Sequence, residues 1–310
     1  MDPRRPPLLA SLTPFTRLLF SVLLVIASFS FLFLAGLLLA GPIFGIGPGD
    51  LAGALSDYDD PNTLSVLQYF QVIQTVGMFI LPPLLAGWFF TRNTGGYLSL
   101  SVPARPQFYI LTLLLVAASL PLINWLIALN EGLELPAFLH ALESWMRETE
   151  DSAARLTEAF MVMPSAGALW FNLLMIAVLP ALGEELMFRG LVQRLLGDWL
   201  GNVHLAIFLA SVLFGAMHMQ FYGLLPRIVL GLMLGYLFYW SGSLWVPVFG
   251  HLLNNGAAVM AAWLVQHGHL AEDWEEFVSA DISWGVALSF AVTAALLFAA
   301  WRYSVKSVES

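Results

Sequence analysis

The chain has no cysteine among its 310 residues. A disulfide framework, a thiol nucleophile and a thiolate metal site are therefore excluded. The glycine-rich loops that bind phosphates, GxGxxG and GxxxxGKS/T, are also missing, as is the GxSxG turn of serine hydrolases. The chemistry of this chain must therefore come from side chains other than thiols, and a serine nucleophile is disfavoured.

Charge is also scarce. Only 11% of the residues are charged, against about 25% in a soluble domain, and 59% are hydrophobic. The mean hydropathy is +0.80. One globule cannot hide so much apolar surface, so the composition predicts an integral membrane protein whose main partner is the lipid bilayer. The formal net charge of −9 argues against a nucleic-acid partner.

Eight apolar runs are long enough to cross a membrane, which takes roughly 20 residues. They cover residues 18–40, 65–90, 107–129, 167–188, 204–221, 224–240, 244–264 and 284–301. We therefore expect an all-α polytopic membrane helix bundle with about eight transmembrane helices. The first run is too long for the core of a signal peptide, so it predicts a retained anchor.

The distribution of Lys and Arg predicts the orientation of the bundle. If there are eight spans, nine of the twelve positive residues fall on one side, which is then cytoplasmic. These nine are Arg4, Arg5, Arg17, Arg92, Arg105, Arg189, Arg194, Arg302 and Lys306. The other three, Arg147, Arg155 and Arg227, fall outside. Both termini are expected in the cytoplasm. With no sorting sequence beyond the first span, we expect a prokaryotic inner membrane.

Acidic residues concentrate in three predicted external loops, 43–63, 131–165 and 265–283, which hold sixteen of the twenty-one. The middle loop contains Leu139–Phe160, in which Leu142, Trp145 and Met146 recur at helical spacing. This segment predicts an amphipathic helix that lies on the outer surface and covers the bundle. The loop acids themselves are expected to be solvated surface.

The strongest functional signal is a polar segment inside an apolar run, Glu184-Glu185 followed by Arg189. Polar residues inside a span are expensive and therefore indicate function. Glu185 and Arg189 are four residues apart with the acid first, the favourable order for a helical ion pair. Glu184 points about 100° away and lacks that partner. The arrangement suits Glu184 as a general base, although a purely structural clamp of these residues is the alternative.

Two histidines also occur within predicted spans. His218 follows Phe214 by four residues, and His251 precedes Asn255 by four, so each pair shares a helix face. A lone histidine in a span is usually structural. Two of them, together with Glu184 and an amide, favour a site. The remaining histidines, His140, His204, His267 and His269, are expected to be ordinary surface residues.

Turn residues predict that these side chains meet. Gly201 lies midway between Glu184 and His218, so a hairpin that turns there places both at one depth. A second turn at Gly242 places His251 roughly 14 Å below it, at 1.5 Å rise per residue. Three helices thus deliver Glu184, His218 and His251 to one level.

Two chemistries fit this group of residues. In the first, Glu184 activates a water molecule while the histidines or Asn255 bind the oxyanion. In the second, Glu184, His218 and His251 hold a zinc ion with a bound water. The HExxH helix of many zinc peptidases is absent, so zinc ligands would have to come from three separate helices.

The three motifs EExxxR (Glu184, Glu185, Arg189), FxxxH (Phe214, His218) and HxxxN (His251, Asn255) occur in this order on separate spans. Together they resemble the motif set of the CAAX-protease and bacteriocin-processing (CPBP) family, which includes the type II CAAX prenyl endopeptidase.

The resemblance suggests that the chain has three regions. They are residues 1–166, with three spans and an acidic external loop; 167–264, a four-helix catalytic core; and 265–310, an acidic loop and the last span.

The resemblance implies an intramembrane endopeptidase that cleaves a membrane-associated protein or peptide. It implies that Glu184 is the base, that His218 helps to hold the attacking water, and that His251 and Asn255 form the oxyanion hole. Glu185, Arg189 and Phe214 would support them. The family has been described both as metalloproteases and as metal-free glutamate proteases. Asn255 favours the second description, since a neutral amide suits an oxyanion better than zinc. No cofactor is therefore favoured, and zinc is the alternative.

Two other functions remain open at the level of the sequence. The same residues would serve a noncatalytic membrane protein that binds or scaffolds a peptide, such as an immunity or maturation factor. They would also serve a proton-coupled transporter in which Glu184 and the histidines titrate. The lack of a clear inverted repeat weakens the transporter interpretation.

Overall fold

The computed structural model describes residues 7–45, 60–271 and 282–306. These residues form helices and connecting turns without any strand, which confirms the predicted all-α bundle. The first half comprises α1 (Pro14–Phe44), α3 (Pro61–Thr75), η1 (Val76–Ile80), α4 (Leu81–Thr91), α5 (Thr94–Tyr97), α6 (Pro106–Glu131), η2 (Ala137–Leu139) and α7 (His140–Phe160). The second half comprises α8 (Ala166–Asn172), η3 (Leu173–Val178), α9 (Leu179–Glu185), η4 (Leu186–Gln193), α10 (Arg194–Leu200), α11 (Val203–Ala216), η5 (Phe221–Gly223), α12 (Leu224–Ser241), α13 (Trp245–Gln266) and α15 (Ile282–Lys306).

Seven helices of the described chain are long and apolar enough to cross a membrane. They are Pro14–Phe44, Pro61–Thr91, Pro106–Glu131, Ala166–Leu200, Phe221–Ser241, Trp245–Gln266 and Trp284–Ser304. The predicted span 204–221 differs, because α11 is a helix of only 14 residues. It stops at Ala216, and the turn that follows holds Met219 in the left-handed region, at φ 53°. α11 therefore ends before it is long enough to cross a membrane, and the turn leads the chain back into the bundle.

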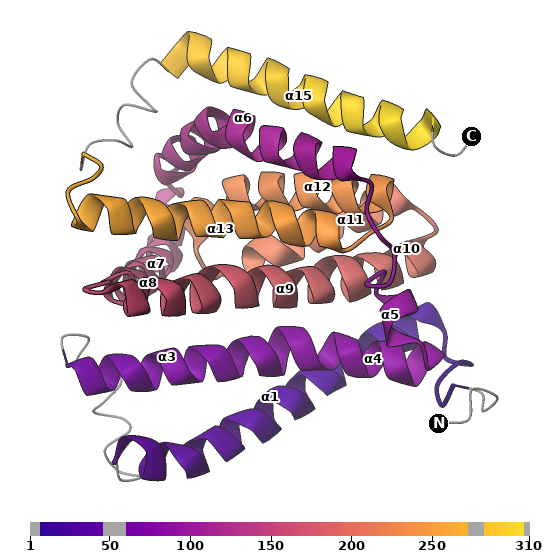
Figure 1. The fold of residues 1–310 in the computed structure, drawn as a ribbon, viewed down its shortest axis with the longest axis horizontal. Coiled ribbons are helices and arrows are strands. Elements are labelled where there is room, and N and C mark those ends of the chain that lie inside the picture. Colours follow the sequence, from indigo (N-terminus) through magenta and orange to yellow (C-terminus); the bar gives the residue numbers. More distant parts are fainter. Residues whose placement is uncertain (1–6, 46–59, 272–281, 307–310) are drawn as a thin grey trace.

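The helices run side by side, with α1 and the continuous α3–η1–α4 helix at one edge and α15 at the other (Figure 1). α15 packs on α6, while α11 packs on α12. The long helix that runs from α8 to α10 lies between the α3–α4 helix and α13 (Figure 1). The centre of the bundle is therefore built from the segment 166–266, in which all the motifs lie.

The chain reverses at residues that the sequence marks as turns. α10 ends at Gly201, which adopts φ 65°, and Asn202 then caps α11 by accepting from the Leu205 amide. α12 likewise ends at Gly242, at φ 68°. Positive φ is the conformation that glycine adopts without steric cost, so both predicted hairpin turns are confirmed.

The start of α1 and the end of α15 lie at the same end of the bundle, on the right in Figure 1. The end of α4, the start of α6 and α10 share that end, and they carry Arg92, Arg105 and Arg194. The opposite end carries α7 with Arg147 and Arg155. These arginines therefore segregate between the two ends as the sequence predicts. Arg189, which the sequence analysis assigns to the cytoplasmic side, is instead buried inside the bundle, 1% exposed and paired with Glu185.

α7 is the amphipathic helix that the sequence predicts for residues 139–160. It packs on η5, with the rings of Trp145 and Phe221 centred 5.3 Å apart. The Tyr222 amide donates to Glu150 at 2.7 Å. α7 thus lies on the short link between α11 and α12.

The external loops predicted at 43–63 and 265–283, like Arg4 and Arg5, fall largely outside the described residues.

Candidate active site

The ion pair predicted between Glu185 and Arg189 lies at the centre of the bundle. Arg189 Nη1 donates to Glu185 Oε1 at 2.8 Å, and the two residues are 1% and 0% exposed. Arg189 Nη2 donates to the Gly231 carbonyl at 3.0 Å, and the guanidinium lies 4.8 Å from the centre of the Phe214 ring. The arginine therefore ties the long α8–α10 helix to α11 and α12.

Glu185 also orients His251, a contact that the spacing of the sequence does not reveal. Its Oε1 lies 2.8 Å from His251 Nδ1, and His251 is 3% exposed. A carboxylate only accepts hydrogen bonds, so Nδ1 carries the proton in this pair. The other ring nitrogen, Nε2, then faces Glu184 Oε2 at 3.8 Å.

His218 reaches the same carboxylate oxygen from α11. Its Nδ1 lies 2.8 Å from the Phe214 carbonyl, which can only accept, so Nδ1 is the donor. Its Nε2 lies 3.9 Å from Glu184 Oε2. The structure thus brings together the three residues that the sequence places at one level, and two imidazoles present their Nε2 atoms to one oxygen.

Phe214 is the common support of these side chains. Its ring centre lies 5.0 Å from the His218 ring and 5.7 Å from the His251 ring, in edge-to-face arrangements. Phe214 itself is 2% exposed and packs edge-to-face on Phe188. A rigid aromatic residue with two histidines and Arg189 around it fixes the relative positions of the motif residues.

Glu184 makes no direct hydrogen bond through its buried Oε2, whereas Glu185 bonds to Arg189 and His251 through Oε1 and leaves its own Oε2 without a partner among the described residues. Among the described residues, none donates to Glu184 Oε2. The separations of 3.8 and 3.9 Å from the two Nε2 atoms exceed a direct hydrogen bond, and they match the span that one shared water molecule bridges. A carboxylate flanked by two imidazole acceptors is an arrangement that can bind and deprotonate water.

Asn255 lies one turn along α13 from His251, as predicted. Its Nδ2 donates to the Ile176 carbonyl at 3.2 Å, and its Oδ1 accepts from Asn254 at 3.2 Å. Ile176 belongs to the π-helical segment η3, and π-helical turns are frequent at functional sites. An amide nitrogen carries two protons, so Asn255 keeps one N–H for another acceptor. No contact places that N–H at Glu184 within the described chain.

Zinc ligation by Glu184, His218 and His251 was the alternative drawn from the sequence. Metal-bound histidines commonly donate their second nitrogen to a carboxylate or carbonyl, as both rings do here, so their orientation alone fits either chemistry. The Glu184 oxygen lies 3.8 and 3.9 Å from the two Nε2 atoms, so the residues could hold a metal ion as well as a water, and metal-free catalysis stays a prediction.

Some contributors to the site are not predictable from the motifs. The Ile176 carbonyl is invisible in a sequence, because any residue carries one. Asn254 belongs to none of the three motifs, although two adjacent amides in an apolar run are an unusual signal. The sequence marks Arg227 only as an external charge, yet its Nη2 donates to the side chain of Gln220, in the turn that follows His218.

Residues 166–257 match the family model described as "Type II CAAX prenyl endopeptidase Rce1-like". The matched segment contains all three motifs and every residue of the cluster around Glu184. It therefore confirms the family resemblance that the motifs indicate. No curated protein and no solved structure matches the chain.

Proposed function

We propose that this chain, assigned to the CAAX-protease family by that match and its motifs, is an intramembrane endopeptidase in which Glu184 activates water. One observation supports this most: Glu184 Oε2 is approached by the Nε2 atoms of His218 and His251, at 3.9 and 3.8 Å, from two other helices. Each imidazole is fixed through its Nδ1.

In the proposed reaction, Glu184 takes a proton from a water that His218 Nε2 helps to orient. The water oxygen attacks the carbonyl carbon of the peptide bond, and the carbonyl oxygen becomes an oxyanion. The C–N bond then breaks, and the proton held by Glu184 passes to the departing amine. One water is consumed, and the products are a new carboxyl terminus and a new amino terminus.

The oxyanion would be bound by Asn255 and His251. Asn255 offers the amide N–H that the Ile176 carbonyl does not use. His251 can donate from Nε2 when its ring is doubly protonated, and Glu185, 2.8 Å from Nδ1, can balance that charge. A buried carboxylate has the same role behind the histidine of serine proteases.

The reaction is proposed to need no metal, and the substrates to be membrane-associated proteins or peptides. A direct test compares membranes that contain the wild-type protein with membranes that contain the Glu184→Ala variant. Quantitative proteomics should find intact substrates that accumulate only in the variant, together with new termini that occur only with wild type. Identical peptide and terminus profiles in the two membranes would contradict the proposed activity.

A further inference from the structure

The position of His218 depends on the segment that follows α11. Because α11 ends at Ala216, His218 lies in the η5 link, residues 217–223, which joins α11 to α12. The His218 amide bonds to the Gly215 carbonyl at 3.3 Å, and the next residue, Met219, has φ 53°. A residue in such a turn is not fixed by a continuous helical ladder of hydrogen bonds. The contacts that hold the η5 link therefore also set the place of the His218 ring.

Asn130, in the last turn of α6, holds the η5 link at two points. Its Nδ2 donates to the Phe221 carbonyl at 2.8 Å, and its Oδ1 accepts from the Leu225 amide at 3.3 Å. Leu225 lies in the first turn of α12, and the N-cap residue of that helix, Gly223, has no side chain to cap it. Asn130 thus supplies from another helix the cap that α12 lacks.

The burial of Asn130 is unusual for an amide at this place. Asn130 is 3% exposed, and α6 is one of the helices that are long and apolar enough to cross a membrane. A polar side chain buried in such a helix is costly unless it is hydrogen-bonded, and it indicates function by default. Both ends of the Asn130 amide are bonded, and both bonds go to the backbone around the η5 link.

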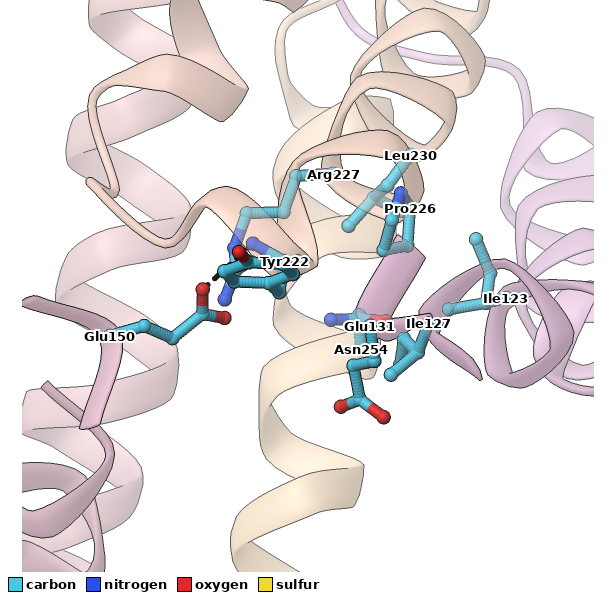
Figure 2. Close-up of a pocket in the computed structure, with 10 residues that line it drawn as sticks. Ile123, Ile127, Glu131, Glu150, Tyr222, Pro226, Arg227, Leu230 and Asn254 are labelled. Carbon is cyan, nitrogen blue, oxygen red and sulfur yellow. Dashed lines mark hydrogen bonds between the residues drawn. The ribbon is translucent and has the colours of Figure 1, made fainter. Parts of the chain in front are cut away.

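The η5 link has a second anchor on α7. Glu150 accepts from the Tyr222 amide at 2.7 Å, but Glu150 is partly exposed on a surface helix. Figure 2 shows the pocket of about 320 Å³ beside the link, lined by Tyr222, by Glu150 and by Ile127 and Glu131 of α6. Because a pocket adjoins the link on this side, hydrogen bonds rather than a continuous layer of side chains hold it. Asn130 is the more deeply buried of the two anchors.

We propose that Asn130 is a positioning residue of the candidate active site, which acts through the η5 link to keep His218 Nε2 directed at the water next to Glu184. His218 Nε2 lies 3.9 Å from Glu184 Oε2, and a displacement of about 1 Å at a catalytic group can cost about 100-fold in rate. Asn130 lies outside the three motifs and outside the matched segment 166–257, so the first spans also serve the site. This inference rests on the proposed endopeptidase function.

The test uses full-length protein in proteoliposomes. The principal variant is Asn130→Leu, which keeps the side-chain volume but removes both hydrogen bonds, and Asn130→Ala is the second variant. Gln193→Leu is the matched control. Gln193 is also buried, at 5% exposed, and its Nε2 donates to the Gly235 carbonyl at 3.2 Å, away from the η5 link. Thermal unfolding in detergent shows whether each variant folds.

The first measurement needs no substrate. Diethyl pyrocarbonate modifies accessible imidazoles, and mass spectrometry gives the modification rate of each histidine. The His218 side chain is 30% exposed, and the exposed His204 serves as the internal reference. Asn130→Leu should raise the rate at His218 relative to His204, because the link that holds His218 is released. Gln193→Leu should keep the ratio of wild type.

The second measurement is the rate of cleavage of the peptide that wild type cleaves fastest from a pool of synthetic peptides. Asn130→Leu should lower kcat by roughly 10- to 100-fold with little change in KM, because misplacing a catalytic group costs rate rather than binding. In a His218→Gln background the same substitution should change kcat by no more than about twofold, since the group that it positions is gone. Gln193→Leu should leave kcat near that of its parent in both backgrounds. If His218→Gln has no measurable rate, the modification rate of His218 decides.

The outcomes separate this inference from the proposed function. An unchanged modification rate and kcat in Asn130→Leu overturn the inference and leave the peptidase intact. An equal fold-loss of kcat with and without His218 means that Asn130 acts through another group, which also overturns it, as does the failure of both Asn130 variants to fold. A raised His218 rate in a protein whose wild type cleaves no peptide supports the positioning role and contradicts the peptidase. No cleavage by wild type and no change at His218 contradict both.

Discussion

Glu184 and Glu185 are adjacent in sequence but have different surroundings. Glu185 is fully buried and its Oε1 contacts both Arg189 and His251 at 2.8 Å, whereas Glu184 has no direct charged partner, its Oε2 lying 3.8 and 3.9 Å from the two imidazoles. Helical geometry explains the difference, because successive side chains point about 100° apart. One carboxylate is therefore structural and positions a histidine, while its neighbour is available for chemistry.

The first prediction concerns these two carboxylates. Arg189→Ala leaves Glu185 buried without its cation and should lower the free energy of unfolding by roughly 3–5 kcal/mol. Glu184→Gln removes no ion pair with arginine and should remain as stable as wild type but inactive. Thermal unfolding in detergent, measured beside peptide cleavage, checks both. A stable Arg189→Ala protein with an unstable Glu184→Gln protein would reverse the two roles.

The second prediction concerns Asn255. Asn255→Ala should lower turnover by roughly 100- to 1,000-fold, as the loss of one oxyanion donor does. Asn62→Ala is the control, since it removes an exposed amide in the first turn of α3, away from the site. It should retain the turnover of wild type. Equal turnover of Asn255→Ala and wild type would remove Asn255 from the oxyanion hole.

The third prediction concerns zinc. If Glu184 deprotonates water without a metal, cleavage by the purified protein should survive exhaustive treatment with a chelator. Metal analysis of the active protein should find zinc well below one ion per chain. Activity that is lost to the chelator and restored by zinc would instead make Glu184, His218 and His251 ligands.

At the scale of the elements, hydropathy and turn residues predict most of the helices. The hairpin turns at Gly201 and Gly242 and the amphipathic α7 follow from local sequence, because capping and periodicity are local properties. The π-helical segments η3 and η4 were not predictable. Their geometry depends on distant partners, such as the Asn255 amide that bonds to the Ile176 carbonyl.

As with the helices, part of the candidate site could be predicted from the sequence and part could not. The motif spacing places Glu184, His218 and His251 together correctly, since equal distances from a turn give equal depth. The bond between Glu185 and His251 was not predictable, because the rotation of α13 about its axis depends on packing. Arg227 likewise gains its place from the fold of the η5 link rather than from any motif.

The fourth prediction belongs to α7. The Arg147 hydrogen bonds hold the pKa of Glu143 below its ordinary value of 4.5, and the Leu135 amide and Tyr222 hydroxyl also donate to Glu143. A lowered folded pKa contributes stability above the ordinary value, and this stability is lost as the pH falls through the lowered one. Docking of α7 should therefore weaken only below a pH of about 4.5.

Hydrogen exchange of the α7 amides, expressed as protection relative to the intrinsic rate at each pH, measures this docking. Glu143→Gln should be less protected at neutral pH and should not change on acidification. Glu148→Gln, on the exposed side of the same helix, should behave as wild type. Protection of wild-type α7 that stays constant well below that pH would contradict this role of Glu143.

At the scale of the whole molecule, the end of the bundle that holds the start of α1 and the end of α15 also holds the elements that carry Arg17, Arg92, Arg105, Arg194 and Arg302 (Figure 1). By the positive-inside rule this end is predicted to be cytoplasmic and α7 external. Because the natural chain lacks cysteine, single introduced thiols report the topology cleanly. Glu148→Cys should react with an impermeant maleimide in intact cells, and Asp198→Cys of α10 only after permeabilisation. The reverse pattern would invert the predicted orientation.

The central claim is that Glu184 activates the water that cleaves a peptide bond within this bundle. The most direct test is the rate of peptide cleavage by purified protein in proteoliposomes, for wild type, Glu184→Gln and His204→Gln. His204 is exposed, and its Nδ1 lies 3.0 Å from the Tyr236 hydroxyl, so its variant serves as the control. We predict that Glu184→Gln lowers the rate by roughly 10²- to 10⁴-fold, the usual contribution of a general base, while His204→Gln stays near wild type. Cleavage by Glu184→Gln at the wild-type rate would contradict the account.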